Sequence, residues 1–273
     1  MNFRIGYHTI CWGGVVGVPV GVTSVKDLFY LSNGDVLRAL ADIAEVGYDG
    51  FELFDGNLLG FEHDLAPLRS IIDATGLTPL GVYSGANFIF DEILDEEMWR
   101  ISRASDLAAE IGARHLVVGG GAQRSTGIGD DDYRKLGEAL DRVVAIAEGN
   151  GLSCVYHPHL TTIVETPEQI ARILSLSRIG LCVDTAHVAA GGGDPSKVIR
   201  DHFDRVRYVH LKDFTPDPFG FQPLGKGDLD MAGIVATLDE LGYEGWATVE
   251  LDSFDGDPKE AAAVSRRFLK ERG

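Results

Sequence analysis

Two histidines flank a proline in the segment CVYHPHLTTIVET, residues 154–166, directly after a short β-branched run. Histidines this close together are common in loops, so His157 and His159 can be two ordinary loop residues beside a turn. Imidazole is also the commonest metal ligand among side chains, so the pair can equally belong to a metal site. Its place in the fold decides between these interpretations.

Three more residues of metal-ligand type close short apolar runs further along the chain. They are Asp184 in LCVDTAH, His210 in RYVHLKDF and Glu250 in WATVELD. If these runs are neighbouring parallel strands, their ends meet at one rim, together with the end of the run before His157. Two imidazoles and two carboxylates suit one divalent ion of intermediate hardness, Mn²⁺, Co²⁺ or Zn²⁺. We therefore predict a metal site formed by His157, Asp184, His210 and Glu250.

Flanking residues supply a second layer around this site. His187 follows Asp184 by three residues in DTAH, and Lys212 and Asp213 follow His210 directly. His159 and Lys212 are expected to hold substrate oxygens, and Asp213 to orient an imidazole. The alternatives are that DTAH is a helix cap and that Lys212 and Asp213 are a surface pair.

The elements that must position these residues follow a recurring pattern: an amphipathic helical stretch, a glycine, and a short apolar run that ends in polar residues. The runs lack clean alternation, as expected for parallel strands buried on both faces. His8 and Glu52 end the first two runs and are expected to contact the substrate. The predicted strands are 3–7, 50–54, 78–83, 115–118, 153–156, 179–183, 206–210 and 246–251.

Local signals mark where the helices between these strands begin and end. Thr166 and Asp194 each precede a proline, which is typical of an N-cap followed by the first helical residue. Glycines stand where helices should end, since glycine accepts the left-handed conformation that closes the last turn. These glycines are Gly47, Gly76, Gly112, Gly151 and Gly242.

Eight such units predict a single α/β domain over residues 1–273, a closed (β/α)8 TIM barrel. The alternative, an open doubly wound sheet, is disfavoured because no GxGxxG follows the first strand. Two connections, at about 12–32 and 214–229, are longer than most loops. Both lie on the side where barrels build active sites, so we expect lids or substrate walls; oligomer contact and plain insertion are the alternatives.

The composition narrows the class of protein and its partners. The net charge of −18 argues against nucleic acid, because binding phosphates requires clustered lysines and arginines. No segment has the roughly 20 apolar residues that span a bilayer, and the start has no secretion signal, so no membrane partner and a cytoplasmic location are expected. A small carbohydrate or polyol is the expected partner, and a homo-oligomer is allowed.

The chain resembles the xylose isomerase-like TIM barrel superfamily of sugar phosphate isomerases and epimerases over essentially its whole length. The segments that carry the resemblance include DGFELF, HPHLTTIVETPEQI, LCVDTAHVAAGGGDP, RVRYVHLKDF and PLGKGDLD. The motifs HPH, DTAH and HLKD and the ending GYEGWATVELD most resemble the inosose dehydratase branch. The resemblance implies a single divalent ion bound by the residues that close strands five to eight.

One position departs from the ketose epimerase branch of this superfamily. There the strand-five position is usually a glutamate, which forms a two-base pair with the strand-eight glutamate. Here it is His157, and a metal-bound imidazole cannot easily serve as a base as well. Two-base epimerisation then requires Glu52, Glu165 or His187 in the missing role.

The chemistry common to the superfamily branches is removal of a proton beside a carbonyl, with the resulting enediolate stabilised by the ion. We expect Glu250 as the base and Lys212 or His187 as the acid. The expected function is a metal-dependent isomerase or epimerase of a sugar or keto-polyol. The alternatives are an inosose-type dehydratase, a lyase acting on a sugar conjugate, an endonuclease IV-like enzyme and a sugar-binding barrel without catalysis.

Overall fold

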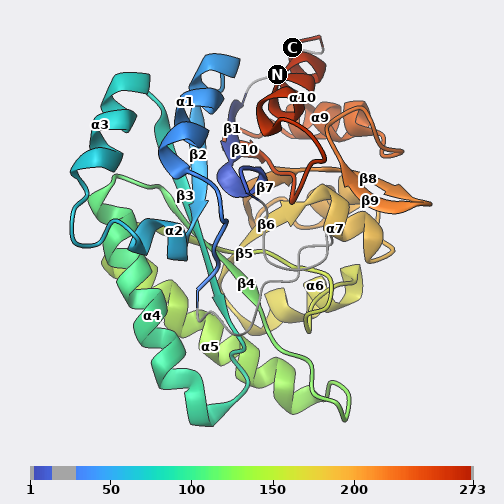
Figure 1. Ribbon diagram of the computed structural model, residues 1–273. Coiled ribbons are helices and arrows are strands. Elements are labelled where there is room, and N and C mark those ends of the chain that lie inside the picture. Colours follow the sequence, from blue (N-terminus) through green and yellow to red (C-terminus); the bar gives the residue numbers. More distant parts are fainter. Residues whose placement is uncertain (1–2, 14–28, 272–273) are drawn as a thin grey trace.

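A computed structural model of the chain describes residues 3–13 and 29–271 (Figure 1). Eight parallel strands close into a barrel in the order β1-β10-β7-β6-β5-β4-β3-β2. The predicted (β/α)8 barrel is therefore confirmed. The barrel strands are β1 (Arg4–His8), β2 (Gly50–Phe54), β3 (Thr78–Ala86), β4 (His115–Gly120), β5 (Ser153–Tyr156), β6 (Gly180–Asp184), β7 (Val206–Leu211) and β10 (Trp246–Val249).

Helices surround the barrel and connect its strands (Figure 1). A short 3-10 helix, η1 (Thr9–Cys11), follows β1. The α-helices are α1 (Val36–Val46), α2 (Asp55–Leu59), α3 (Ala66–Thr75), α4 (Asp91–Glu110), α5 (Asp130–Gly149), α6 (Pro167–Leu176), α7 (Thr185–Ala190), α8 (Pro195–Asp201), α9 (Met231–Glu240) and α10 (Pro258–Lys270).

The helix ends agree with the capping signals. Thr166 accepts a hydrogen bond from the backbone N–H of Gln169, and Asp194 accepts those of Ser196 and Lys197. All five glycines that were predicted to end helices have positive φ, from +67° at Gly76 to +91° at Gly47. These local signals therefore place the helix boundaries correctly.

Strand residues alternate between two apolar layers. Val117 of β4 and Val155 of β5 are register partners and belong to a small cluster inside the barrel, which also contains Leu80, Cys182 and Tyr208. Neighbours such as Leu116 and Val118 instead join the larger cluster between strands and helices. Apolar side chains thus fill the inside of the barrel, so a functional site is expected at the ends of the strands.

The register of the barrel places the polar strand ends side by side. Asp184 of β6 is the direct partner of His210 of β7, and His8 of β1 is the partner of Glu52 of β2. The predicted eighth strand, 246–251, is too long: β10 ends at Val249, so Glu250 is the first residue beyond it. His157 likewise follows the last residue of β5.

The two long connections differ in what can be described. Residues 14–28 of the predicted 12–32 connection lie outside the described residues. Its described end is held against α2, where the Asp55 carboxylate accepts the backbone N–H of Tyr30 at 2.8 Å. The 214–229 connection is not a plain loop, because an antiparallel hairpin, β8 (Asp213–Pro216) and β9 (Phe219–Gln222), spans its first half.

Within the described part of the chain, none of the helices has both the length and the apolar character needed to cross a membrane.

Candidate metal centre and active site

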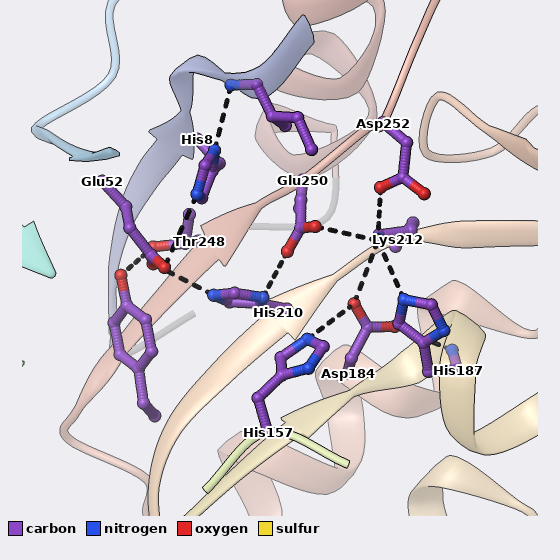
Figure 2. Close-up of polar contacts among 12 residues, drawn as sticks. His8, Glu52, His157, Asp184, His187, His210, Lys212, Thr248, Glu250 and Asp252 are labelled. Atoms are coloured by element: carbon purple, nitrogen blue, oxygen red, sulfur yellow. Dashed lines mark hydrogen bonds and ion pairs between the residues drawn. The ribbon is translucent and has the colours of Figure 1, made fainter. Parts of the chain in front are cut away.

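The four predicted metal ligands meet at the C-terminal rim of the barrel (Figure 2). One ligand atom from each of His157, Asp184, His210 and Glu250 lies within 4.8 Å of all the others. All four side chains are buried. Each comes from the end of a different one of four neighbouring strands, which is why residues so far apart in sequence converge.

The inward atoms of this cluster have the properties of a ligand set. Five polar atoms of this cluster have no hydrogen-bond partner among the described residues. They are Nδ1 and Nε2 of His157, Nδ1 of His210, Oδ2 of Asp184 and Oε2 of Glu250. Buried polar atoms without partners are costly unless something binds them. They face one another: His157 Nε2 lies 3.5 Å from Asp184 Oδ2, and His210 Nδ1 contacts Glu250 Oε2. This buried cluster can hold a metal ion.

Asp184 has a separate task for each carboxylate oxygen. Oδ1 accepts the backbone N–H of His187 at 2.8 Å and so caps α7, whereas Oδ2 points into the cluster (Figure 2). The helix-cap interpretation of DTAH is therefore correct, and it does not compete with metal binding. The cap also fixes the carboxylate at the start of α7, which limits its freedom to turn away from the cluster.

Glu52 holds the far side of the His210 ring. Its Oε2 accepts from Nε2 of His210 at 3.0 Å, and its Oε1 lies 3.7 Å from Nε2 of His8. Burial raises the pKa of Glu52, but the contact with His210 outweighs burial and lowers the pKa overall. With Nε2 of His210 bonded to Glu52, the other ring nitrogen, Nδ1, faces the cluster.

His8 lies beside Glu52 and is held by a hydrogen bond of its own. Its Nδ1 accepts the backbone N–H of Ile10 at 3.0 Å, and burial lowers its pKa to about 4. One oxygen of Glu52 and one nitrogen of His8 are therefore hydrogen-bonded, whereas Glu52 Oε1 and His8 Nε2 have no hydrogen-bond partner among the described residues. Glu52, with His8 beside it, therefore lies on the side of the His210 ring that faces away from the cluster.

Lys212 is a fully buried cation at the centre of the site. Its Nζ lies 2.8 Å from Asp252 Oδ1, 3.0 Å from Glu250 Oε1 and 3.3 Å from Asp184 Oδ2. Burial alone would lower the pKa of Lys212, but these carboxylates outweigh it and raise the pKa well above the ordinary value. The surface-pair interpretation of Lys212 is therefore wrong.

Asp213, the next residue, turns away from the site and organises the chain beyond β7. Its carboxylate accepts the backbone N–H groups of Phe214, Gly225, Gly227 and Leu229 at 2.8 to 3.2 Å. The expectation that Asp213 orients an imidazole is wrong, since Glu52 has that contact. Gly227 is required here, because a Cβ at this position would lie 2.4 Å from the Asp213 carboxylate.

The hairpin that Asp213 anchors carries an aromatic ring to the site. The ring of Phe221, on β9, lies 4.7 Å from Nζ of Lys212 and 5.0 Å from the ring of His187. Phe221 is only partly buried, whereas Lys212 beneath it is completely covered. The 214–229 connection thus reaches the site through Phe221, and its expected role as a lid or substrate wall stays a prediction.

Two further histidines of the site, His159 and His187, lie against each other beside Lys212. The rings of His159 and His187 are 3.8 Å apart, and Nε2 of His187 is 3.5 Å from Lys212 Nζ. Burial lowers the pKa of both, to about 4 for His159, so both rings are neutral near pH 7. Nδ1 of His159 faces the carbonyl of Leu160 at 2.7 Å, and Nδ1 of His187 has no hydrogen-bond partner among the described residues.

Asp252, which the sequence analysis missed, is buried and pairs with Lys212; its spacing of two from Glu250 is the signal that places both side chains on one side of an extended chain. Glu165, considered above as a second base, instead accepts the backbone N–H of Thr161 within its own turn.

Fold and site together define a (β/α)8 barrel with a buried histidine and carboxylate cluster at the C-terminal ends of its strands. Comparison with known proteins gives the family. The profile of the xylose isomerase-like TIM barrel family matches residues 40–272, so the chain belongs to that family. The resemblance noted from the sequence motifs is thereby confirmed.

Individual relatives sharpen this assignment. The chain is 29% identical to inosose dehydratase of Geobacillus kaustophilus, over 92% of this chain and 87% of the relative. It is 26% identical to inosose dehydratase of Clostridium beijerinckii, over 86% of this chain and 89% of that protein. In fold, it is similar to D-allulose 3-epimerase from Methylomonas sp., with a TM-score of 0.78, 19% identity and coverage of 100% and 98% of the two chains.

These relatives confirm that the chain is an enzyme and correct the expected reaction. The sequence motifs led us to expect an isomerase or epimerase, but both of these relatives, matched over 87% and 89% of their length, are named inosose dehydratase. The likeness to the epimerase, at 19% identity, shows the shared barrel only. The expectation of an isomerase or epimerase is therefore wrong, and the dehydratase alternative takes its place.

Proposed function

We propose that the chain is a metal-dependent dehydratase, a lyase that removes water from an inosose-type cyclic keto-polyol. The observation that carries the proposal is His157 in the cluster, at the position where two-base epimerisation needs a carboxylate. The names of the relatives support the same reaction. An elimination needs one base for a carbon acid and one acid for the leaving oxygen, and the site offers both.

The proposed cofactor is one divalent ion, Mn²⁺, Co²⁺ or Zn²⁺, held by His157, Asp184, His210 and Glu250. Mixed imidazole and carboxylate donors suit these ions. When bound, the ion would act as a Lewis acid that stabilises negative charge developing on the substrate carbonyl oxygen.

The protein's own groups then divide the proton transfers. Glu250, held in place by Lys212 and His210, removes the proton from the carbon beside the carbonyl. The electron pair of that C–H bond forms the new C=C bond as the neighbouring C–O bond breaks. The leaving hydroxyl takes a proton from the Nζ ammonium group of Lys212, which lies beside the neutral ring of His187, and departs as water.

Substrate contacts are proposed for the partly exposed side of the site. His159 packs on His187 and keeps Nε2 free of the Leu160 contact, so it can hold a substrate hydroxyl. For His8 and Glu52 the contacts favour a positioning role behind His210 over the direct substrate contact expected from the sequence.

Incubation of the Mn²⁺-loaded protein with a set of inososes tests the proposal. Mass spectrometry should show a product lighter by one water, and Glu250→Gln should lower the rate by about 100-fold or more. Ketohexoses serve as control substrates. A product of unchanged mass and inverted configuration would show epimerisation instead, and no reaction with any inosose would refute the proposed substrate class.

A further inference from the structure

Asp252 lies next to the proposed metal site but contributes no atom to the ligand cluster. Its Oδ1 lies closer to Lys212 Nζ than either neighbouring carboxylate does, at 2.8 Å (Figure 2). Its Oδ2 has no hydrogen-bond partner among the described residues. Among the described residues, Lys212 is therefore the only hydrogen-bond partner of this buried side chain, so the hydrogen-bonded link between Asp252 and the site is the lysine.

The lysine and the proposed ion need the same carboxylates. Lys212 Nζ approaches Asp184 Oδ2, one of the oxygens that face the cluster, and Oε1 of Glu250. Without another counter-ion, the ammonium group would compete with the ion for Asp184 and Glu250. Three carboxylates contact Lys212, those of Asp184, Glu250 and Asp252, and together they carry as many charges as one divalent ion and the ammonium group. Without Asp252 they carry one charge fewer, and Glu52 is outside this group because it pairs with the His210 ring.

We infer that Asp252 is a positioning residue that holds Lys212 and so leaves Asp184 and Glu250 available to the metal ion. The inference rests on the proposed metal-dependent function and deepens it. Asp252 fixes the distance of the ammonium group from the ligands, and Phe221 covers the same group from the hairpin side. Asp252 is thus a buried carboxylate beside the proposed ligand set that binds the lysine and not the ion.

Titration of the chelator-treated full chain with Mn²⁺ tests this inference without any substrate. Asp252→Asn should weaken Mn²⁺ binding by about 10- to 100-fold, the usual cost of losing a residue that supports metal ligands. Asp252→Glu should restore part of the affinity. Asp255→Asn is the matched control, since it removes the same charge from an exposed position three residues away and should leave the affinity within about twofold.

The double variant Asp252→Asn/Lys212→Met separates the lysine from a general effect on folding. Removing both charges ends the competition, so the double variant should bind Mn²⁺ more tightly than Asp252→Asn alone. Folding of each variant is followed by thermal unfolding. Wild-type affinity in Asp252→Asn, or a double variant as weak as the single one, would overturn the inference. A wild-type chain that binds no Mn²⁺ would instead refute the proposed metal site.

Discussion

The carboxylate of Glu52 and the ring of His210 are joined across the barrel, with Oε2 of Glu52 3.0 Å from Nε2 of His210. The other ring nitrogen, Nδ1, faces Glu250. A carboxylate on the outer nitrogen of a metal-binding histidine fixes the tautomer and the ring orientation and increases the basicity of the ligand nitrogen. Glu52 would therefore prepare His210 for the proposed ion, although it does not reach the cluster itself.

From this contact we predict that Glu52→Gln weakens Mn²⁺ binding by about 10-fold or more while the chain still folds. The amide keeps the size of the side chain but loses the charge that holds the His210 proton at Nε2. Calorimetric titration with Mn²⁺ measures the effect. Glu45→Gln, at an exposed position on α1, is the control and should bind as the wild type does. Equal affinities for both variants would contradict the positioning role.

Asp184 allows metal binding to be separated from helix capping. Asp184→Asn keeps a side-chain oxygen that can accept the His187 N–H, because asparagine is as good an N-cap as aspartate. It removes the charge that the ion requires, so elemental analysis should find no bound ion. The free energy of unfolding should stay at the wild-type value, because the α7 cap is kept. Asp184→Ala should lose the ion and also about 1 kcal/mol of stability from the missing cap. Retention of the ion by Asp184→Asn would remove this residue from the ligand set.

Asp213 should affect stability more than metal binding. Asp213→Ala leaves four backbone N–H groups around the hairpin without their acceptor, which we expect to lower the free energy of unfolding by about 2–4 kcal/mol. Denaturant titration measures this loss. Asp228→Ala, an exposed aspartate of the same segment, should stay within about 0.5 kcal/mol of the wild type. A small effect at Asp213 would mean that the hairpin is held by other contacts.

Much of the architecture could be predicted from the sequence, because strand, helix and cap signals are local. A run of buried residues predicts a strand, and the residue that ends it lies on the rim whatever the other strands do. His157, Asp184 and His210 could therefore be assigned to one cluster without knowledge of their contacts. Glu250 was also placed there, although β10 ends one residue before it.

What could not be predicted depends on side-chain direction and on contacts distant in sequence. Lys212 and Asp213 are neighbours, yet one points into the site and the other into the hairpin, and no local pattern tells which. The Glu52 and His210 contact joins residues 158 positions apart. The reaction itself was misassigned because the enolising step is common to isomerases and dehydratases, and the residues for that step do not fix what leaves.

His115 gives a prediction for pH that is independent of the metal ligands. Its ring stacks on Tyr208 near the inside of the barrel, with the ring centroids 4.7 Å apart, and burial lowers its pKa from 6.5 to about 4. Between these pH values the unfolded chain binds the proton and the folded chain does not. The free energy of unfolding should therefore fall as the pH falls from 6.5 to about 4, by no more than about 1.4 kcal/mol per pH unit from this residue.

The variant His115→Phe keeps an aromatic ring against Tyr208 and removes the titrating group, so its stability should decline less steeply over this pH range. Other buried histidines also titrate there, and the comparison with the wild type isolates the share of His115. His63→Phe, at a position where the side chain is 93% exposed, should leave the slope unchanged. Denaturant unfolding at several pH values measures both slopes, and a slope equal to that of the wild type in His115→Phe would show that the ring is not held neutral by burial.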